Sequence, residues 1–383
     1  MPNIANVTPE IIKWARNLHN LTRSELAEKA SVHENQIAKW ETGKTKPTII
    51  QAQNLASQLR IPFGYLFLSE PPTLEDPLPD LRTRKDRKLK GLSFEAREVL
   101  YGVLDIQDWY REYRLEYDRE KLPFVAKFGV NDNPRVVAAD IRETLSINVE
   151  LRANARTLNA YLTALSERAE AKGILVMQSG IVGNNQSRPL SADEFQGFVI
   201  ADEIAPVVFI NSRDYIAARI FTLAHELAHV WVGKSGILNP QEGTVDAHID
   251  TEAFCNAVAT ETLVPANEFL TAYENYQGSL NDLSGYFRVS RLVTLRRAFE
   301  LKLIPSSEFF VRLQGLQKVT SKKKKRKGGP PDYLFNVAMR HSPTFTESVI
   351  KDVRVGGTLV RDAASLLHMR TPTFSRMAES GEY

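Results

Sequence analysis

Apolar positions in the first seventy residues recur at the spacing of short helices. Ile11, Ile12, Ala15 and Leu18 lie at intervals that place them on one helical face. Two start signals for helices occur in this segment. Thr8 is followed directly by Pro9, and Thr22 is followed three positions later by Glu25. We therefore expect an all-helical domain over residues 1–68.

The pattern then breaks and changes type. "EPPTLEDPLPDL" followed by "RTRKDRKLK" cannot form a helix interior, which places a linker at residues 69–90. Residues 91–122 return to helical spacing, with an aromatic row of Trp109, Tyr113 and Tyr117 that we expect to pack between elements. A further helix is expected at about 153–171.

Strands are expected only in the middle of the chain. "GILVMQSG", "FQGFVIAD" and "APVVFINS" are rich in Val, Ile and Phe and are bounded by turn residues. Their short separations predict a small, mainly antiparallel sheet in meander order. Helices are expected again from residue 221 onward, so the fold class is a multi-domain α+β protein.

Composition narrows the class of protein without deciding its function. The 383 residues contain 43% hydrophobic and 25% charged residues, and the formal net charge of +3 gives no general affinity for nucleic acids. Cys255 is the one cysteine, so no disulfide can form within the chain. With no apolar run long enough to span a membrane, we expect a cytoplasmic protein without a membrane partner.

The stretch "FTLAHELAHVWVG" carries the strongest chemical signal. On a helix, His225 and His229 lie on one face and can share a Zn²⁺ ion. Glu226 follows the first histidine and can act as a base on a metal-bound water without being a ligand. The spacing therefore predicts a hydrolytic metal site.

A third protein ligand is expected downstream. Glu252 should lie at the start of the next helix, with Asn256 one turn later to hold a ligand histidine by a hydrogen bond. His248 is the rival for this position, or a residue that contacts substrate. Tyr215, His248 and Arg288 are candidates for contacts to the substrate or the transition state, and the sequence does not choose among them.

"RIFTLAHELAHVWVG" followed by "DTEAFCNAVATETLVP" resembles the ImmA/IrrE family of zinc metallopeptidases over roughly residues 153–305. The resemblance implies a gluzincin-like site in which His225, His229 and Glu252 bind the metal and Glu226 is the catalytic base. It implies Zn²⁺ as the cofactor, with Mn²⁺ also acceptable to these ligands. From the family we also expect strand 206–211 to bind an extended peptide at the sheet edge.

Residues 8–68 resemble the XRE, or lambda-repressor-like, helix-turn-helix family through "ARNLHNLTRSELAEKASVHENQIAKWETGKTKPT". The resemblance implies that the third helix enters the major groove of DNA and that Arg16 and Glu41 form a structural ion pair. Six residues are expected at the DNA, four at base edges and two at phosphates: His33, Glu34, Asn35, Lys39, Arg23 and Lys44. The alternative is that the module docks another helix-turn-helix protein or forms a dimer instead of binding DNA.

The C-terminal part carries weaker signals. "VSRLVTLRRAF" resembles a second helix-turn-helix-like unit, whose Arg291, Arg296 and Arg297 are a candidate nucleic-acid surface. A basic Gly/Pro linker is expected at 317–331 and a small helical unit at 332–383, so residues 91–316 hold the peptidase domain and its following helices. His341 and His368 are isolated in the sequence and receive no role.

Together these features favour a regulatory metalloendopeptidase with its own DNA-binding domain. The family implies that its substrate is a helix-turn-helix repressor, cut in response to stress, DNA damage or a phage or mobile element. The alternative is an XRE-family regulator or toxin–antitoxin component in which the zincin domain is a sensor or interaction module. A homodimer is an assembly that the sequence permits.

Overall fold

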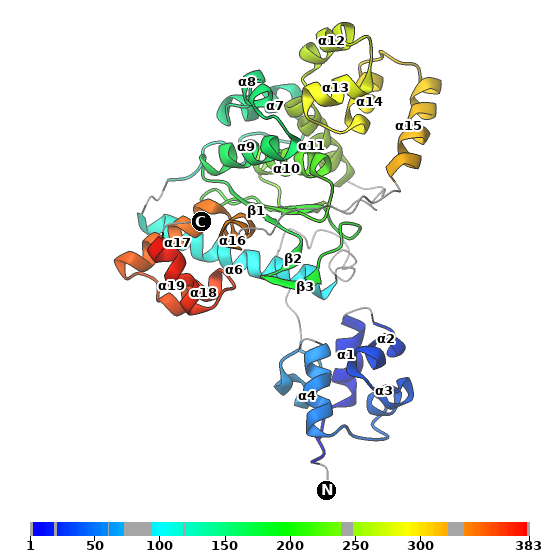
Figure 1. Ribbon diagram of the computed structural model, residues 1–383, viewed down its shortest axis with the longest axis vertical. Helices are drawn as coiled ribbons and strands as arrows, with labels where there is room; N and C mark the ends of the chain where they lie inside the picture. Colours follow the sequence, from blue (N-terminus) through cyan, green and yellow to red (C-terminus); the bar gives the residue numbers. More distant parts are fainter. Residues whose placement is uncertain are drawn as a thin grey trace. The chain divides into compact units, whose positions relative to one another are not determined.

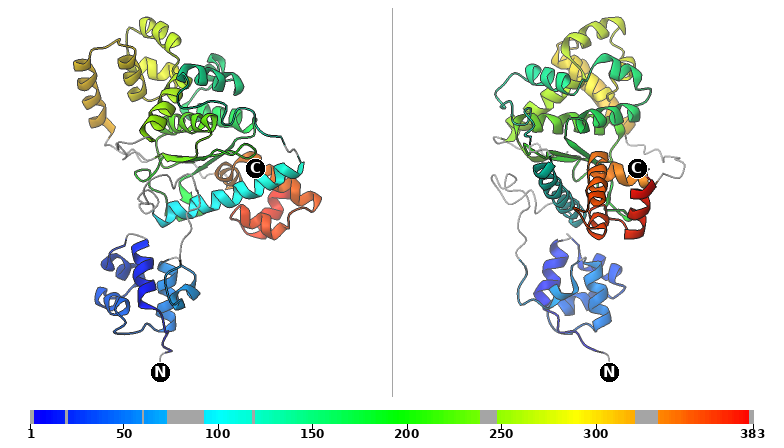
Figure 2. Two further views of the ribbon diagram at one scale, coloured as in Figure 1. Left: turned by 180° about the vertical axis from the view of Figure 1, so that it is seen from behind. Right: turned by 90° about the vertical axis from the view of Figure 1, so that its left-hand side faces the viewer.

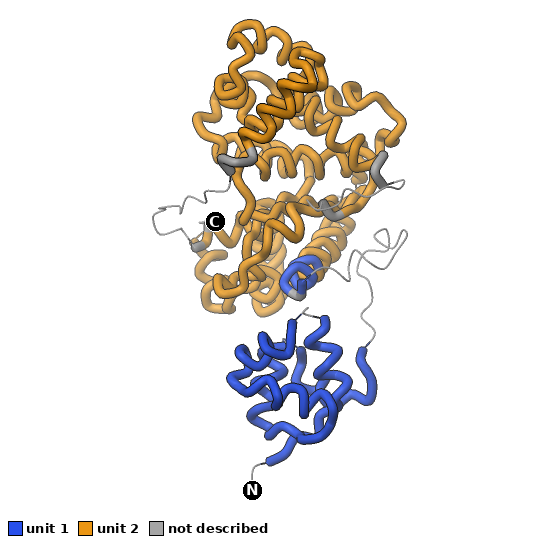
Figure 3. Tube along the Cα trace, turned by 90° about the vertical axis from the view of Figure 1, so that its right-hand side faces the viewer, with its two compact units in different colours: residues 1–100 blue, residues 101–383 orange. Residues whose placement is uncertain are grey.

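The computed structural model describes residues 3–18, 21–59, 61–72, 93–117, 120–238, 248–320 and 333–380. These residues form two compact units, 1–100 and 101–383, coloured separately in Figure 3. The division falls within helix α6 (Phe94–Tyr117). Each unit is described by itself below.

The first unit is a bundle of short helices, as the apolar spacing predicts. Its elements are α1 (Pro9–Leu18), α2 (Arg23–Ala30), α3 (Glu34–Glu41), α4 (Ile49–Gln58) and the 3₁₀ helix η1 (Phe63–Phe67). Thr22 and Thr48 each cap a helix with a reciprocal capping box, which satisfies backbone N–H groups that the first turn leaves open. Trp40 and Ile37 lie fully buried in its core.

The second unit is built around a four-stranded sheet of β1 (Leu175–Ser179), β4 (Gly197–Ile200), β5 (Val207–Asn211) and β6 (Gly236–Leu238). The strand order is β1-β5-β4-β6. β1 and β5 are parallel, whereas β4 is antiparallel to both β5 and β6. The sheet is therefore mixed, and the meander order expected from the sequence is wrong, since β1 pairs with β5 and not with β4. A two-stranded ribbon of β2 (Ile181–Val182) and β3 (Asn185–Pro189) follows β1.

Helices cover both faces of this sheet (Figures 1 and 2). One face holds α7 (Pro134–Thr144), α8 (Val149–Asn154), α9 (Leu158–Glu170), α10 (Ile216–Val232) and α11 (His248–Leu263), which share one hydrophobic core with the strands. The chain then continues through α12 (Ala266–Asn275), α13 (Leu280–Phe287), α14 (Arg291–Glu300) and α15 (Ser306–Thr320).

The opposite face is covered by α6 and by the C-terminal helices α16 (Tyr333–His341), α17 (Pro343–Val355), α18 (Val360–Leu366) and α19 (Thr371–Ser380). α16 packs on β1, and the backbone N–H of Thr344 donates to the buried carboxylate of Glu170 at 2.8 Å. The aromatic row packs as expected, because Trp109 stacks on Tyr113 and meets Phe345 of α17 edge-on. The C-terminal helices are thus part of the second unit.

His341 and His368 are not isolated in the fold, contrary to the sequence-based expectation. Nε2 of His341 lies 3.1 Å from Nδ1 of His368, and Nδ1 of His341 lies 2.9 Å from the carbonyl oxygen of Val337. Burial lowers the pKa of His341 to about 3, so its ring is neutral. The pair lies beside Gly183 of the β2–β3 turn, where a side chain would press on the His368 ring.

We expect Gly233→Ala to lower the free energy of unfolding of the second unit by about 1–3 kcal/mol. Gly233 caps α10 with φ +65°, and an added Cβ would lie 2.5 Å from Cβ of Ala126. Urea denaturation measures the change. Gly285→Ala is the matched control: this glycine lies within α13 with nothing within 4 Å of an added Cβ, so it should be neutral or slightly stabilising. Equal losses in both variants would refute the strain argument.

Candidate metal centre and DNA-binding face

Helix α10 presents two histidines inside the second unit. The helix is apolar on nearly every side because it is buried between the sheet and its neighbouring helices. His225 is fully buried and His229 is 3% exposed. Their four-residue spacing places both rings on one face, and the two Nε2 atoms lie 3.1 Å apart.

Helix α11 brings a carboxylate to the same point. α11 packs along α10, and the oxygens of Glu252 lie 3.1 Å from Nε2 of His225 and 3.4 Å from Nε2 of His229. The three side chains offer ligand atoms that all lie within 4.8 Å of one another.

Hydrogen bonds on the far side of each ring determine which nitrogen faces Glu252. Nδ1 of His229 lies 3.0 Å from the carbonyl oxygen of Lys234, which only accepts, so this Nδ1 carries the proton. Nδ1 of His225 lies 3.1 Å from Oδ1 of Asn256, with the same consequence. Both Nε2 atoms therefore turn lone pairs toward a carboxylate. Converging lone pairs repel unless a cation lies among them, so these residues fit a divalent metal of the Zn²⁺ or Mn²⁺ kind.

Glu226, which follows His225 in the chain, is a buried carboxylate next to this cluster. Its side chain is 1% exposed, and among the residues that the structure describes its Oε1 has no hydrogen-bond partner. Burial, followed by the nearby charge of Glu252, raises its pKa well above the usual value. On strand β4, a Cβ at Gly197 would lie 3.1 Å from this Oε1, so the glycine keeps space open beside the carboxylate.

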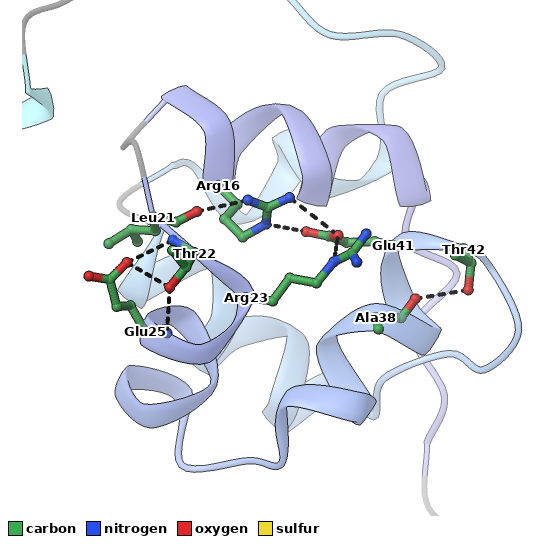
Figure 4. A network of polar contacts seen from close by, with 8 residues as sticks. All are labelled: Arg16, Leu21, Thr22, Arg23, Glu25, Ala38, Glu41 and Thr42. Carbon is green, nitrogen blue, oxygen red and sulfur yellow. Dashed lines mark hydrogen bonds and ion pairs between the residues drawn. The ribbon is translucent and has the colours of Figure 1, made fainter.

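In the first unit, a buried carboxylate ties three helices together (Figure 4). Glu41 at the end of α3 accepts from Nε of Arg16 at 2.5 Å and from Nε of Arg23 at 2.7 Å. Arg16 also donates to the carbonyl oxygen of Leu21. The structure therefore contains the Arg16–Glu41 pair and adds Arg23 to it. Arg23 keeps 42% of its side chain exposed, so a phosphate contact from its remaining N–H groups stays a prediction.

The outer face of α3 is open to solvent. His33, Glu34, Asn35 and Lys44 are exposed and Lys39 is half-buried. The buried side chains of the helix face the opposite way, into the core. Three of the four residues predicted for base readout are thus exposed and the fourth is half-buried, and their contacts with DNA stay a prediction.

Comparison with protein families accounts for both regions. Residues 169–299 match the model of the IrrE N-terminal-like domain, Peptidase_M78, and residues 12–66 match a helix-turn-helix model, HTH_3. The chain joins an XRE-type helix-turn-helix domain to an ImmA/IrrE-type domain. Residues 342–380 match a domain of unknown function, DUF8813. Searches of curated proteins and of solved structures found no match. No described helix is both long and apolar enough to cross a membrane.

The roles of the other residues predicted for the IrrE-like site stay predictions. Tyr215 is the 57% exposed N-cap residue of α10, ten residues or about 15 Å along the axis from His225. Arg288 ends α13 in a left-handed conformation. His248 begins α11, one turn before Glu252, and its side chain lies outside the described residues.

Two contributors to the IrrE-like site were not predicted from the sequence. They are the backbone carbonyl of Lys234 and Gly197. For Gly197 a signal exists, because a glycine inside a strand of branched residues often marks a close approach to another group. For Lys234 there is none, since any residue supplies a carbonyl oxygen.

One of the three arginines predicted for a nucleic-acid surface is buried, whereas Arg291 and Arg296 are exposed and their role stays a prediction. Arg297 is 6% exposed, donates from Nε to the carbonyl oxygen of Val264 at 3.0 Å and forms an ion pair with Glu261. It ties α14 to the end of α11. The predicted nucleic-acid surface is therefore wrong at this position, because a buried, paired guanidinium cannot reach a phosphate.

We expect Asn256→Ala to weaken binding of Zn²⁺ by about 10- to 100-fold, because His225 loses the group that orients its ring. Competition with a chromogenic chelator measures the dissociation constant. Asn267→Ala, on the surface of α12, is the matched control and should leave it unchanged. Unaltered affinity in Asn256→Ala would show that the hydrogen bond contributes nothing to the centre.

The Arg16–Glu41–Arg23 network predicts a pH dependence of the helix-turn-helix unit. Burial would raise the pKa of Glu41, but hydrogen bonds from both arginines lower it below the ordinary value of 4.5. A lowered folded-state pKa contributes stability above pH 4.5 that is lost as pH falls through the lowered value. Thermal unfolding of residues 1–72 should therefore show falling stability in this acid window.

Glu41→Gln should remove that part of the pH dependence and cost about 1–3 kcal/mol at neutral pH. Glu34→Gln, an exposed carboxylate on the same helix, should retain the wild-type profile. A wild-type acid profile in Glu41→Gln would mean that another group is responsible.

Proposed function

We propose that this protein is a metal-dependent regulatory endopeptidase that cleaves a helix-turn-helix repressor. The observation that carries the proposal is the His225–His229–Glu252 cluster beside the carboxylate of Glu226, whose Oε1 has no hydrogen-bond partner among the described residues. This arrangement lies within the residues that match a peptidase family. Binding alone would need no buried base next to the three ligand atoms.

The chain's own residues supply the proton chemistry. His225, His229 and Glu252 would hold Zn²⁺ or Mn²⁺, which when bound polarises the scissile carbonyl and acidifies water. Glu226 would accept a proton from that water and pass it to the leaving amine. Burial raises the pKa of Glu226. This brings the proton affinity of its carboxylate closer to those of the water that gives up the proton and the amine that receives it. Lys234 and Asn256 keep both imidazoles in the tautomer that leaves Nε2 available.

The sheet restricts where an extended substrate can bind. The expected edge strand at 206–211 is wrong, because β5 is paired on both sides, with β1 and with β4. β6 is the end strand next to β4 and directly follows the helix that carries His229. A Cβ added at its Gly236 would lie 3.7 Å from Cε1 of His229. We infer that a substrate segment pairs with β6.

The helix-turn-helix domain supports DNA binding by this protein. We propose that the exposed face of α3 directs it to an operator and that the repressor bound nearby is the substrate. The first unit presents His33, Asn35 and Lys44 to solvent in keeping with this role. Cleavage would inactivate the repressor and release its genes, and a homodimer would match a symmetric operator.

We expect Glu226→Gln to abolish cleavage of a repressor encoded by a neighbouring gene while metal binding is retained. The substitution keeps the shape of the side chain and removes its basicity. Purified protein with Zn²⁺ or Mn²⁺ is incubated with candidate repressors, with and without operator DNA, and mass spectrometry locates the cut. Glu261→Gln is a poor control because it pairs with Arg297, so the surface change Glu274→Gln serves instead.

Metal-loaded protein that cuts none of these repressors would overturn the peptidase proposal. If DNA binding and gene regulation in Glu226→Gln then equal those of the wild type, the rival function is favoured. In that function the protein is a regulator in which the IrrE-like domain is a sensor. Loss of cleavage in Glu274→Gln as well would show that the assay reports general damage.

A further inference from the structure

A cavity lies in the second unit, on the side of the sheet opposite α10. It has a volume of about 590 Å³ and lies between α6 and α18, which run close to each other in Figures 1 and 2. This volume is in the range of sites that hold small organic molecules. One wall comes from α6, which precedes the IrrE-like match, and the other from the DUF8813 region.

The walls combine apolar side chains with carboxylates of one sign. Ile106 of α6 and Leu359 and Leu366 of the α18 region supply apolar surface. Asp105 of α6 and Asp362 of α18 bring one carboxylate from each side. Among the described residues that line the cavity there is no lysine or arginine, and His368 is the one basic side chain. The two carboxylates outnumber it, so the charge of the cavity disfavours an anion.

Within the described part of the chain, one ion pair involves these carboxylates, and it is a weak competitor for a ligand. Nε of Arg361 lies 3.1 Å from Oδ1 of Asp362, but the arginine side chain is 81% exposed. Ion pairs between such exposed neighbours contribute little because water screens them. An incoming cation can therefore displace or share this contact at small cost.

Trp109 adds an aromatic wall that is held in place. Its indole Nε1 donates to Oγ1 of Thr358 at 3.1 Å, which links α6 to the turn before α18. The ring stacks on Tyr113 with centroids 5.3 Å apart and meets Phe345 at 88°. A rigid indole favours cations and flat apolar groups over other ligands.

We propose that this cavity binds a small organic cation, a protonated amine with an apolar or aromatic body. The ammonium group lies between Asp105 and Asp362, and the body packs against Trp109 and the aliphatic side chains. Both carboxylates contribute to binding, and they belong to different parts of the chain. The ligand therefore strengthens the attachment of the DUF8813 helices to α6, and its binding raises the unfolding temperature of the protein.

The test measures binding of benzylamine and cadaverine to the full chain by calorimetry and thermal shift at about pH 8, where imidazoles are neutral and alkylamines are charged. Benzyl alcohol is the neutral control with the same ring. We expect both amines to bind and benzyl alcohol to bind at least about tenfold more weakly. Raising NaCl from about 50 to about 500 mM should weaken amine binding only.

Matched variants locate the site. Asp105→Asn and Asp362→Asn should each weaken benzylamine binding about twofold to fivefold, as expected for exposed charges, and the double variant about tenfold or more. Asp108→Asn changes an exposed carboxylate on α6 that does not line the cavity, and it should bind like the wild type. Ser365→Tyr fills the cavity from the exposed side of α18 without changing charge and should remove binding.

Three results would overturn the proposal. The first is that neither amine binds with a dissociation constant below about 10 mM, a floor for ligands of this size. The second is that benzyl alcohol binds as tightly as benzylamine. The third is that Asp108→Asn weakens binding as much as Asp105→Asn does. None of these readouts depends on peptidase activity, so they stand apart from the test of Glu226.

Discussion

The meeting of two imidazole lone pairs and a carboxylate is the constraint around which the second unit is organised. His225 and His229 turn Nε2 toward Glu252 because their Nδ1 atoms are already used by Asn256 and by the carbonyl oxygen of Lys234. Two buried imidazoles and a partly exposed carboxylate turn lone pairs toward one point, and such lone pairs repel one another unless a cation lies among them. Helix α10 is buried on nearly all sides, so packing holds the two rings in this arrangement.

The surrounding structure explains how this geometry is held. α10 ends at Gly233, whose left-handed conformation turns the chain so that the next carbonyl, that of Lys234, returns to His229. α11 lies along α10 and carries Glu252, whose carboxylate lies beside both histidines, and Asn256, whose amide lies 3.1 Å from Nδ1 of His225. Strand β4 contributes Gly197, which has no side chain and therefore leaves space beside Glu226. A small set of backbone features therefore defines the chemistry.

The C-terminal helices are an integral part of the second unit. They lie against β1 and α6, and Glu170, Asn184 and Trp109 each bond to them. The region of unknown function is thus attached to the IrrE-like core and to α6 through polar contacts, of which the hydrogen bond between Trp109 and Thr358 lies at the cavity between α6 and α18. A small cation bound there would act on that attachment, far in sequence from helix α10.

The sequence by itself determined the local features of this protein. Helix caps and the four-residue spacing of the histidines depend on neighbours within a few turns, and periodicity reveals such features. The choice of Glu252 as the third candidate ligand depended on only one following helix. The capping box at Thr22 and the packing of Trp109, Tyr113 and Tyr117 were predictable for the same reason.

Only the tertiary structure decided the long-range features. The pairing of β1 with β5, the burial of Arg297 on Glu261 and the contact of His341 with His368 join segments that are 27 or more residues apart. Strand order and ion pairing at such separations depend on which surfaces meet when the core closes. That closure is a property of the whole packed chain, and no local pattern of residues encodes it.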